Sequence, residues 1–326
     1  MDGSSQKEGS AAKASEVVEL LSTTTPDLSA CIGRFDKTWG GSPTKIDCSL
    51  HYVAFRDSKP DVDRLIELAH DRIINFALPQ RRIEEIEARY SNPKARDAAA
   101  ALMREARELF MNTKGKTKRS GEFGELLLYM LLEWILEAPI VACKMYLKTS
   151  QAMPVHGTDG IHLGFDGDQL LVYWGESKLH ASLTSALDSV LESVQEHQSS
   201  VGKRVNEIRI LTMNGNLDFD KLPKETREAA KGFFHPYHPN YNKVADCHAC
   251  LVGFDSDLYD SVANLSHDTC DESFREKLEA KMDSIVTQII DKTAKAGLEK
   301  VRFSYFVLPF PSVKAARERF EKVLWG

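Results

Sequence analysis

The chain has 326 residues, of which 42% are hydrophobic, so it can bury the core of one large domain or two smaller ones. Its formal net charge of −6 argues against a protein that grips nucleic acid over its whole surface, but it leaves room for one local basic groove. The most apolar stretch, residues 126–136, is shorter than the roughly 20 residues that a spanning helix needs, so we expect no membrane segment.

The first residues and the cysteines point to a reducing compartment. Residues 1–28 are rich in Ser, Thr, Ala and Gly, and we expect a flexible N-terminus without the apolar core of a secretion signal. Six cysteines are scattered along the chain. We therefore expect reduced cysteines and a cytoplasmic protein.

Residues 29–112 are predicted to form an α-rich N-terminal region. Residues 46–55 alternate weakly between apolar and polar and are predicted to be a strand. Helices are then predicted from apolar residues at helical spacing, over 61–76, 83–90 and 93–110. The region contains no catalytic signature, so we interpret it as a helical platform or a unit that docks a partner.

A basic loop follows this region. Its cations are Lys114, Lys116, Lys118 and Arg119. The sequence leaves two interpretations open, a solvated linker and a loop that contacts nucleic-acid phosphates beside a functional site.

Residues 121–137 are predicted to be a helix so apolar that it must lie against a sheet. Glu122 and Glu125 share one face near its start, because they are three residues apart. They are either two solvated glutamates favoured by the helix dipole, or one of them completes a site nearby. A strand is predicted next, over 139–147.

The segment 157–178 is predicted to be a hairpin that gathers two acids and a lysine. Its turn is predicted at 166–168, where Asp and Gly tolerate positive φ angles. Glu176 and Lys178 are two apart on the second strand, so they point to the same face, and the first strand can bring Asp159 beside them. Two carboxylates and an amine at one sheet edge predict a divalent-metal site with a lysine that acts on a water molecule.

Helices and strands alternate in the remaining sequence. Helices are predicted over 183–194, 274–296 and 313–324, and strands over 207–213, 250–254 and 302–308. A helix, three strands, a helix and a strand, followed by further alternation, predict an α/β fold around a mixed sheet.

This order of elements, with Glu on the first helix, Asp on one strand and Glu-x-Lys on the next, resembles the restriction-endonuclease-like PD-(D/E)xK nucleases. The resemblance is tight over 121–197 and looser elsewhere, and it predicts a nuclease domain over 113–326. Asp159 follows Thr158 rather than the proline of the family pattern.

Three phrases, GEFGELLLYMLLEWI, GTDGIHL and VYWGESKLH, resemble the HamA family more closely. HamA proteins are the nuclease subunits of the Hachiman antiphage defence system. The resemblance implies Mg²⁺-dependent DNA cleavage, with Mn²⁺ as a substitute, restrained by the superfamily 2 helicase HamB until that partner senses aberrant or invading DNA.

In a nuclease of this kind, Asp159, Glu176 and the backbone carbonyl of Ser177 hold Mg²⁺, and Lys178 orients the attacking water and stabilises charge on the phosphate. Glu125 is favoured over Glu122 as a third acid. The alternative function is a catalytically inactive nuclease-fold adaptor that clamps DNA or regulates the helicase.

Other chemistry finds less support in the sequence. His235, His238, Cys247 and Cys250 have a spacing that zinc could use, although Cys250 begins an apolar run. His162 shares no face with Asp159 and is predicted to be structural. The sequence contains neither a Ser–His–Asp order nor an NTP-binding Gly-rich loop, so any ATP-driven step belongs to a partner.

Overall fold

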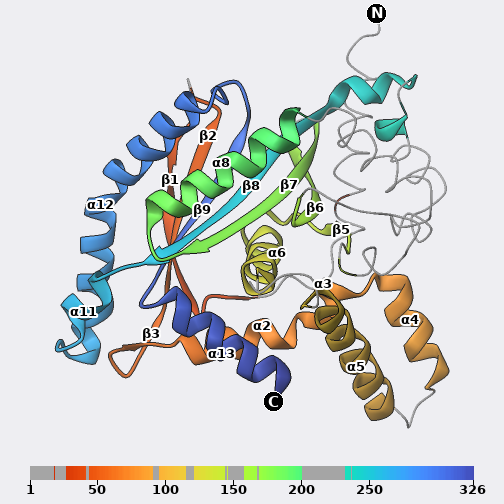
Figure 1. Cartoon of the computed structure of the whole chain (residues 1–326), viewed down its shortest axis with the longest axis horizontal. Coiled ribbons are helices and arrows are strands. Elements are labelled where there is room, and N and C mark those ends of the chain that lie inside the picture. The colour runs from red at the N-terminus through yellow and green to blue at the C-terminus, as the bar shows by residue number, and fades with distance from the viewer. Residues whose placement is uncertain are drawn as a thin grey trace, which may run out of the picture.

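The structure is a computed structural model of the whole chain. It describes residue 18, residues 27–41, 44–90, 95–114, 121–143, 145, 158–166, 169–199, 232–235 and 237–326. Within these residues the fold is mixed α/β, with helices around one seven-stranded sheet (Figure 1).

The sheet has the strand order β1-β2-β9-β8-β7-β6-β5. Its strands are β1 (Ile32–Gly40), β2 (Ile46–Val53), β5 (Ile140–Ala142), β6 (Gly160–Asp166), β7 (Gln169–His180), β8 (Val244–Asp255) and β9 (Phe303–Phe310). Strands β5, β6 and β7 form an antiparallel meander, whereas β7, β8, β9 and β2 run parallel to one another. β1 closes the other edge, antiparallel to β2. A separate two-stranded ribbon consists of β3 (Phe55–Arg56) and β4 (Lys59–Pro60).

Helices cover both faces of the sheet. They are α2 (Val62–Asp71), α3 (Ile73–Ala77), α4 (Gln80–Arg89), α5 (Ala95–Lys114), α6 (Glu122–Leu136), α8 (Leu183–Ser199), α11 (Leu258–Val262), α12 (His267–Lys295) and α13 (Val313–Trp325), with a short 3-10 helix, η2 (Pro239–Lys243). Among the described residues, no helix combines the length and the apolar character needed to cross a membrane.

Alternation along β7 shows which helix covers which face. Gly124 of α6 lies against Ser177, whose side chain therefore points to the α6 face. Trp174 is three residues earlier and packs against His197 of α8, with ring centroids 4.8 Å apart and the ring planes tilted by 47°. The even-numbered residues of β7 therefore face α8 and the odd-numbered residues face α6.

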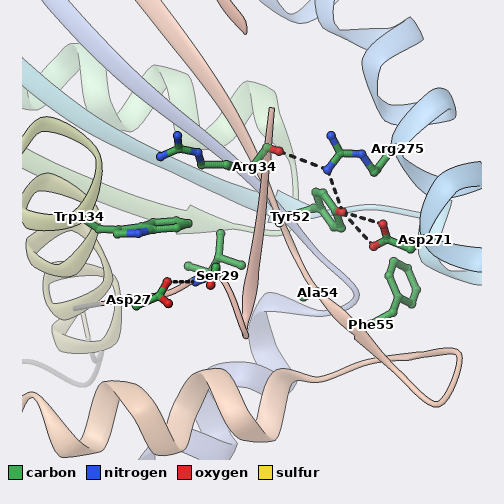
Figure 2. Close-up of a pocket in the computed structure, with 11 residues that line it drawn as sticks. Asp27, Ser29, Arg34, Tyr52, Ala54, Phe55, Trp134, Asp271 and Arg275 are labelled. Atoms are coloured by element: carbon green, nitrogen blue, oxygen red, sulfur yellow. Dashed lines mark hydrogen bonds between the residues drawn. The ribbon is translucent and has the colours of Figure 1, made fainter. Parts of the chain in front are cut away.

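The long helix α12 is anchored to the β1–β2 edge by polar contacts (Figure 2). The Tyr52 hydroxyl donates to Asp271 at 2.8 Å, and Arg275 donates to the Tyr52 oxygen and to the backbone carbonyl of Arg34, both at 3.2 Å. A pocket of about 620 Å³ opens beside these groups and extends to Trp134 of α6. The contacts tie the first two strands to a helix more than 200 residues away in sequence.

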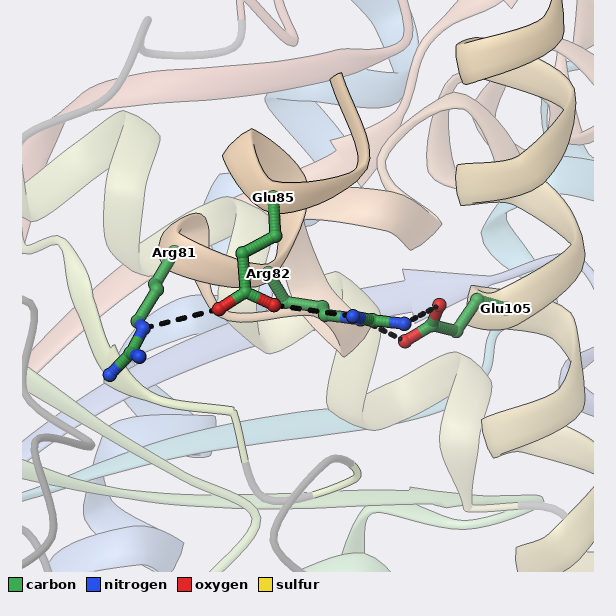
Figure 3. Close-up of polar contacts among 4 residues, drawn as sticks. All are labelled: Arg81, Arg82, Glu85 and Glu105. Atoms are coloured by element: carbon green, nitrogen blue, oxygen red, sulfur yellow. Dashed lines mark hydrogen bonds and ion pairs between the residues drawn. The ribbon is translucent and has the colours of Figure 1, made fainter. Parts of the chain in front are cut away.

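Helices α4 and α5 form a hairpin held by ion pairs (Figure 3). Arg82 of α4 donates from Nε and Nη2 to the two carboxylate oxygens of Glu105 on α5, at 2.7 and 2.9 Å. Glu85 accepts from Arg81 and from Arg82 at 3.2 Å. A two-point arginine–carboxylate contact fixes the orientation of both side chains better than a single hydrogen bond would.

The predicted helix, three strands and helix are confirmed by α6, β5, β6, β7 and α8, and the strand predicted over 250–254 lies within β8. The predicted helix over 61–76 is interrupted at Arg72, between α2 and α3, and the strand predicted over 139–147 is only three residues long. Residues 207–213 lie outside the described part of the chain.

The N-terminal region contains strands as well as helices. β1 was not predicted, and β2 pairs in parallel with β9, with Ile46 opposite Phe303. Both strands belong to the sheet that contains β7, so the division predicted at residue 112 does not coincide with a break in the sheet.

Candidate functional site

The site lies where β6 begins and β7 approaches its end. The backbone N–H of Asp159, immediately before β6, donates to the carbonyl of Gly175 on β7 at 2.7 Å, which fixes the aspartate opposite the Glu-x-Lys sequence. Glu176 and Lys178 both occupy the even-numbered face of β7. The structure therefore brings Asp159, Glu176 and Lys178 together, as the hairpin pattern predicts.

Each of these side chains has a defined contact. The Asp159 Oδ2 atom accepts from the backbone N–H of Ser177 at 2.7 Å and from its hydroxyl at 2.9 Å. The Lys178 Nζ atom donates to Glu176 Oε1 at 2.5 Å. The Glu176 side chain is 7% exposed and that of Lys178 is 28% exposed. A carboxylate pair with one ammonium group is thus held at a partly covered edge.

Burial and charge perturb both partners of the Glu176–Lys178 pair. Burial first, and then the negative charge of Asp159, raise the pKa of Glu176 to about 7, although the charge and hydrogen bond of Lys178 act in the opposite direction. Burial would lower the pKa of Lys178, but the carboxylates of Glu176, Asp159 and Glu125 outweigh it and raise that pKa. Lys178 is therefore an ammonium ion at neutral pH, whereas the surroundings of Glu176 disfavour its ionised form.

The helix α6 brings its first turn to the same place. A Cβ atom at Gly124 would lie 3.1 Å from the Ser177 hydroxyl and 3.3 Å from Leu179 Cγ, so glycine allows an unusually close approach. Glu125 follows directly and acts on the pKa of Lys178, so its carboxylate is within electrostatic reach of the site. Glu122 is the first residue of α6, one turn earlier.

The donor set fits a hard divalent cation. Mg²⁺ prefers oxygen ligands and commonly takes one or two carboxylates from a protein together with water. Asp159 and Glu176 supply two carboxylates whose mutual repulsion a cation would relieve. Within the described residues, no group of three or more His, Cys, Asp or Glu side chains is placed to hold a metal ion, so the third acid stays a prediction.

The other predicted groups lie elsewhere. Lys114 ends α5, whereas Lys116, Lys118 and Arg119 lie outside the described residues. Cys247 and Cys250 are buried on β8 and, being three apart, point to opposite faces of the strand. Together with His235 and His238 they form no metal-binding group in the part of the chain that the structure describes.

His162 is buried in β6, and its Nδ1 atom donates to the backbone carbonyl of Ala138 at 2.8 Å. Burial lowers its pKa to about 4, so the ring is neutral at physiological pH. This agrees with the structural role predicted for it.

A comparison with protein-family models finds that the HamA model matches residues 32–324. The chain belongs to the HamA family. This membership associates it with the Hachiman antiphage defence system. A search of curated proteins found no match.

The HamA match spans the whole seven-stranded sheet, from β1 to β9, and includes all three side chains of the cluster. One contact in this HamA family member was not foreseen from the sequence, the hydrogen bond from the side-chain hydroxyl of Ser177 to Asp159. Only the strand register could have indicated it.

Proposed function

We propose that this HamA family member is a Mg²⁺-dependent DNA endonuclease of the Hachiman system, with a PD-(D/E)xK core and a partner helicase that restrains it. The supporting observation is the convergence of Asp159, Glu176 and Lys178 at one end of β7. These residues come from the elements that the PD-(D/E)xK order assigns to them, with α6 before and α8 after.

In this proposal, Asp159 and Glu176 hold the cation, with the backbone carbonyl of Ser177. When bound, Mg²⁺ supplies Lewis-acid polarisation of the scissile phosphodiester and lowers the pKa of a coordinated water. Two carboxylates 4 Å apart repel each other by about 4 kcal/mol at an effective dielectric near 20, which is why they need a cation between them. Without the cation, the ammonium group of Lys178 offsets part of this repulsion.

The raised pKa of Lys178 determines which role it can take. An amine that stays protonated at neutral pH cannot accept a proton from water, so we assign it as a donor. It orients the attacking water and stabilises negative charge that develops on the phosphate. Because 28% of its side chain is exposed, a substrate phosphate can approach it from solvent.

The test is cleavage of supercoiled plasmid by the purified protein, alone and with its helicase partner. Wild type should nick DNA with Mg²⁺ or Mn²⁺ and stop with EDTA, and Glu176→Ala and Lys178→Ala should each abolish nicking and phage protection. Glu192→Ala, which removes an exposed carboxylate from α8, is the matched control and should cleave normally. If the Glu176 and Lys178 variants equal wild type in cleavage and protection, the protein is a non-catalytic adaptor.

A further inference from the structure

One carboxylate of the cluster, that of Asp159, is held by a serine hydroxyl. Asp159 is oriented through one oxygen, because both the N–H and the hydroxyl of Ser177 donate to Oδ2, at 2.7 and 2.9 Å. Among the described residues no other hydrogen-bond donor reaches this carboxylate. Oδ1 is therefore the oxygen that this arrangement leaves for a ligand.

The Ser177 hydroxyl has little freedom to move away. Its residue is only 8% exposed, and the first turn of α6 covers it so closely that a Cβ atom at Gly124 would lie 3.1 Å from Oγ. A hydroxyl confined between a helix and a carboxylate has one favourable hydrogen-bond direction. The packing of α6 on β7 thus fixes the rotamer of Asp159 indirectly.

Glu176 is held by a different contact. Its Oε1 atom accepts from the ammonium group of Lys178, two residues along the same strand, at 2.5 Å. Asp159 is therefore the carboxylate whose orientation depends on a serine hydroxyl. Ser189 on α8 is also partly buried, and it provides a comparison serine outside the Asp159 contact.

We propose that the hydroxyl of Ser177 is a positioning group that holds the Asp159 carboxylate in the geometry that binds a divalent cation. This inference rests on the proposed function. Outer hydrogen-bond partners of metal-binding groups typically change metal affinity by about 10- to 100-fold when they are removed. Because the Ser177 N–H contact is retained in an alanine variant, we expect a loss near the lower end, about tenfold.

The experiment measures Mn²⁺ binding to the full chain without DNA, by the electron paramagnetic resonance signal of free Mn²⁺. Ser177→Ala should raise the dissociation constant about tenfold. Ser189→Ala removes a partly buried hydroxyl from α8 and should not alter the dissociation constant. Thermal unfolding in EDTA should give the same midpoint for all variants, which separates positioning from a general structural role.

The plasmid assay adds a second, independent readout. Ser177→Ala should require about tenfold more Mg²⁺ for half-maximal cleavage, with a smaller change in the rate at saturating Mg²⁺. If Ser177→Ala binds Mn²⁺ like wild type while Asp159→Asn and Glu176→Gln lose binding, positioning is wrong and the proposed function stands. If Asp159→Asn and Glu176→Gln also bind Mn²⁺ like wild type, both the positioning role and the proposed function are wrong.

Discussion

Glu133 gives a test of the electrostatic reasoning that does not depend on catalysis. This residue lies on α6, is 5% exposed, and accepts hydrogen bonds from Tyr129 and from the backbone of Ile140. Burial raises its pKa to about 7, although those two hydrogen bonds and the charge of Arg72 act in the opposite direction. The folded protein therefore prefers this carboxyl group in its neutral form.

The consequence for stability follows from the two pKa values. In the unfolded chain the pKa of Glu133 is 4.5, so the folded state binds this proton more tightly than the unfolded state does. The stability from this group is full below pH 4.5 and is lost as the pH rises to about 7. At about 1.36 kcal/mol for each pKa unit, the loss above pH 8 is about 3 kcal/mol.

Glu133→Gln preserves the shape of the neutral acid and cannot ionise. We expect the variant to be more stable than wild type at high pH, with an advantage in unfolding free energy that is about 2 kcal/mol larger at pH 8.5 than at pH 5.5. Urea unfolding of both proteins at the two pH values measures this difference. The contributions of groups that titrate in both proteins cancel when the two unfolding free energies are subtracted. Glu137→Gln, at the exposed end of the same helix, controls for removal of charge. An advantage that is equal at the two pH values would refute the reasoning.

Two further predictions concern the cluster itself. Lys178→Met should abolish cleavage without weakening Mn²⁺ binding, because it removes an ammonium that competes with a cation for Glu176; a weaker Mn²⁺ titration would contradict this. Gly124→Ala should gain up to about 1 kcal/mol of helix propensity but push against the Ser177 hydroxyl at 3.1 Å, so urea unfolding should change little while Mn²⁺ affinity falls. Unchanged affinity would show that the hydroxyl can move aside.

The cluster could be predicted from the sequence because its geometry is local. Glu176 and Lys178 are related by the two-residue repeat of a strand, and Asp159 immediately precedes the first strand of the same hairpin, where Gly160 pairs with Gly175. The alternation along the second strand and the pairing of the two strands are both set within the hairpin. Neither relation depends on the rest of the chain.

The parts that could not be predicted depend on long-range packing. β2 finds β9 in parallel register across more than 250 residues, and no local pattern indicates that pairing. β1 shows a mixed burial pattern with three successive exposed residues, so its alternation is weak. Gly124 of α6 lies against Ser177, and only the docked helix shows this contact. Sequence periodicity gives the face of a residue but not its neighbour on another element.

The electrostatics of the site favour a functional over a structural explanation. Burial and the charge of Asp159 both disfavour ionised Glu176, so an apolar or amide side chain at this position would suit a purely structural sheet better. The unfavourable charge lies next to a lysine that stays protonated, on a strand that has α6 against one face and α8 against the other. Strain of this kind at an accessible sheet edge is typical of sites that bind a cation, because the ion removes the repulsion that folding alone leaves in place.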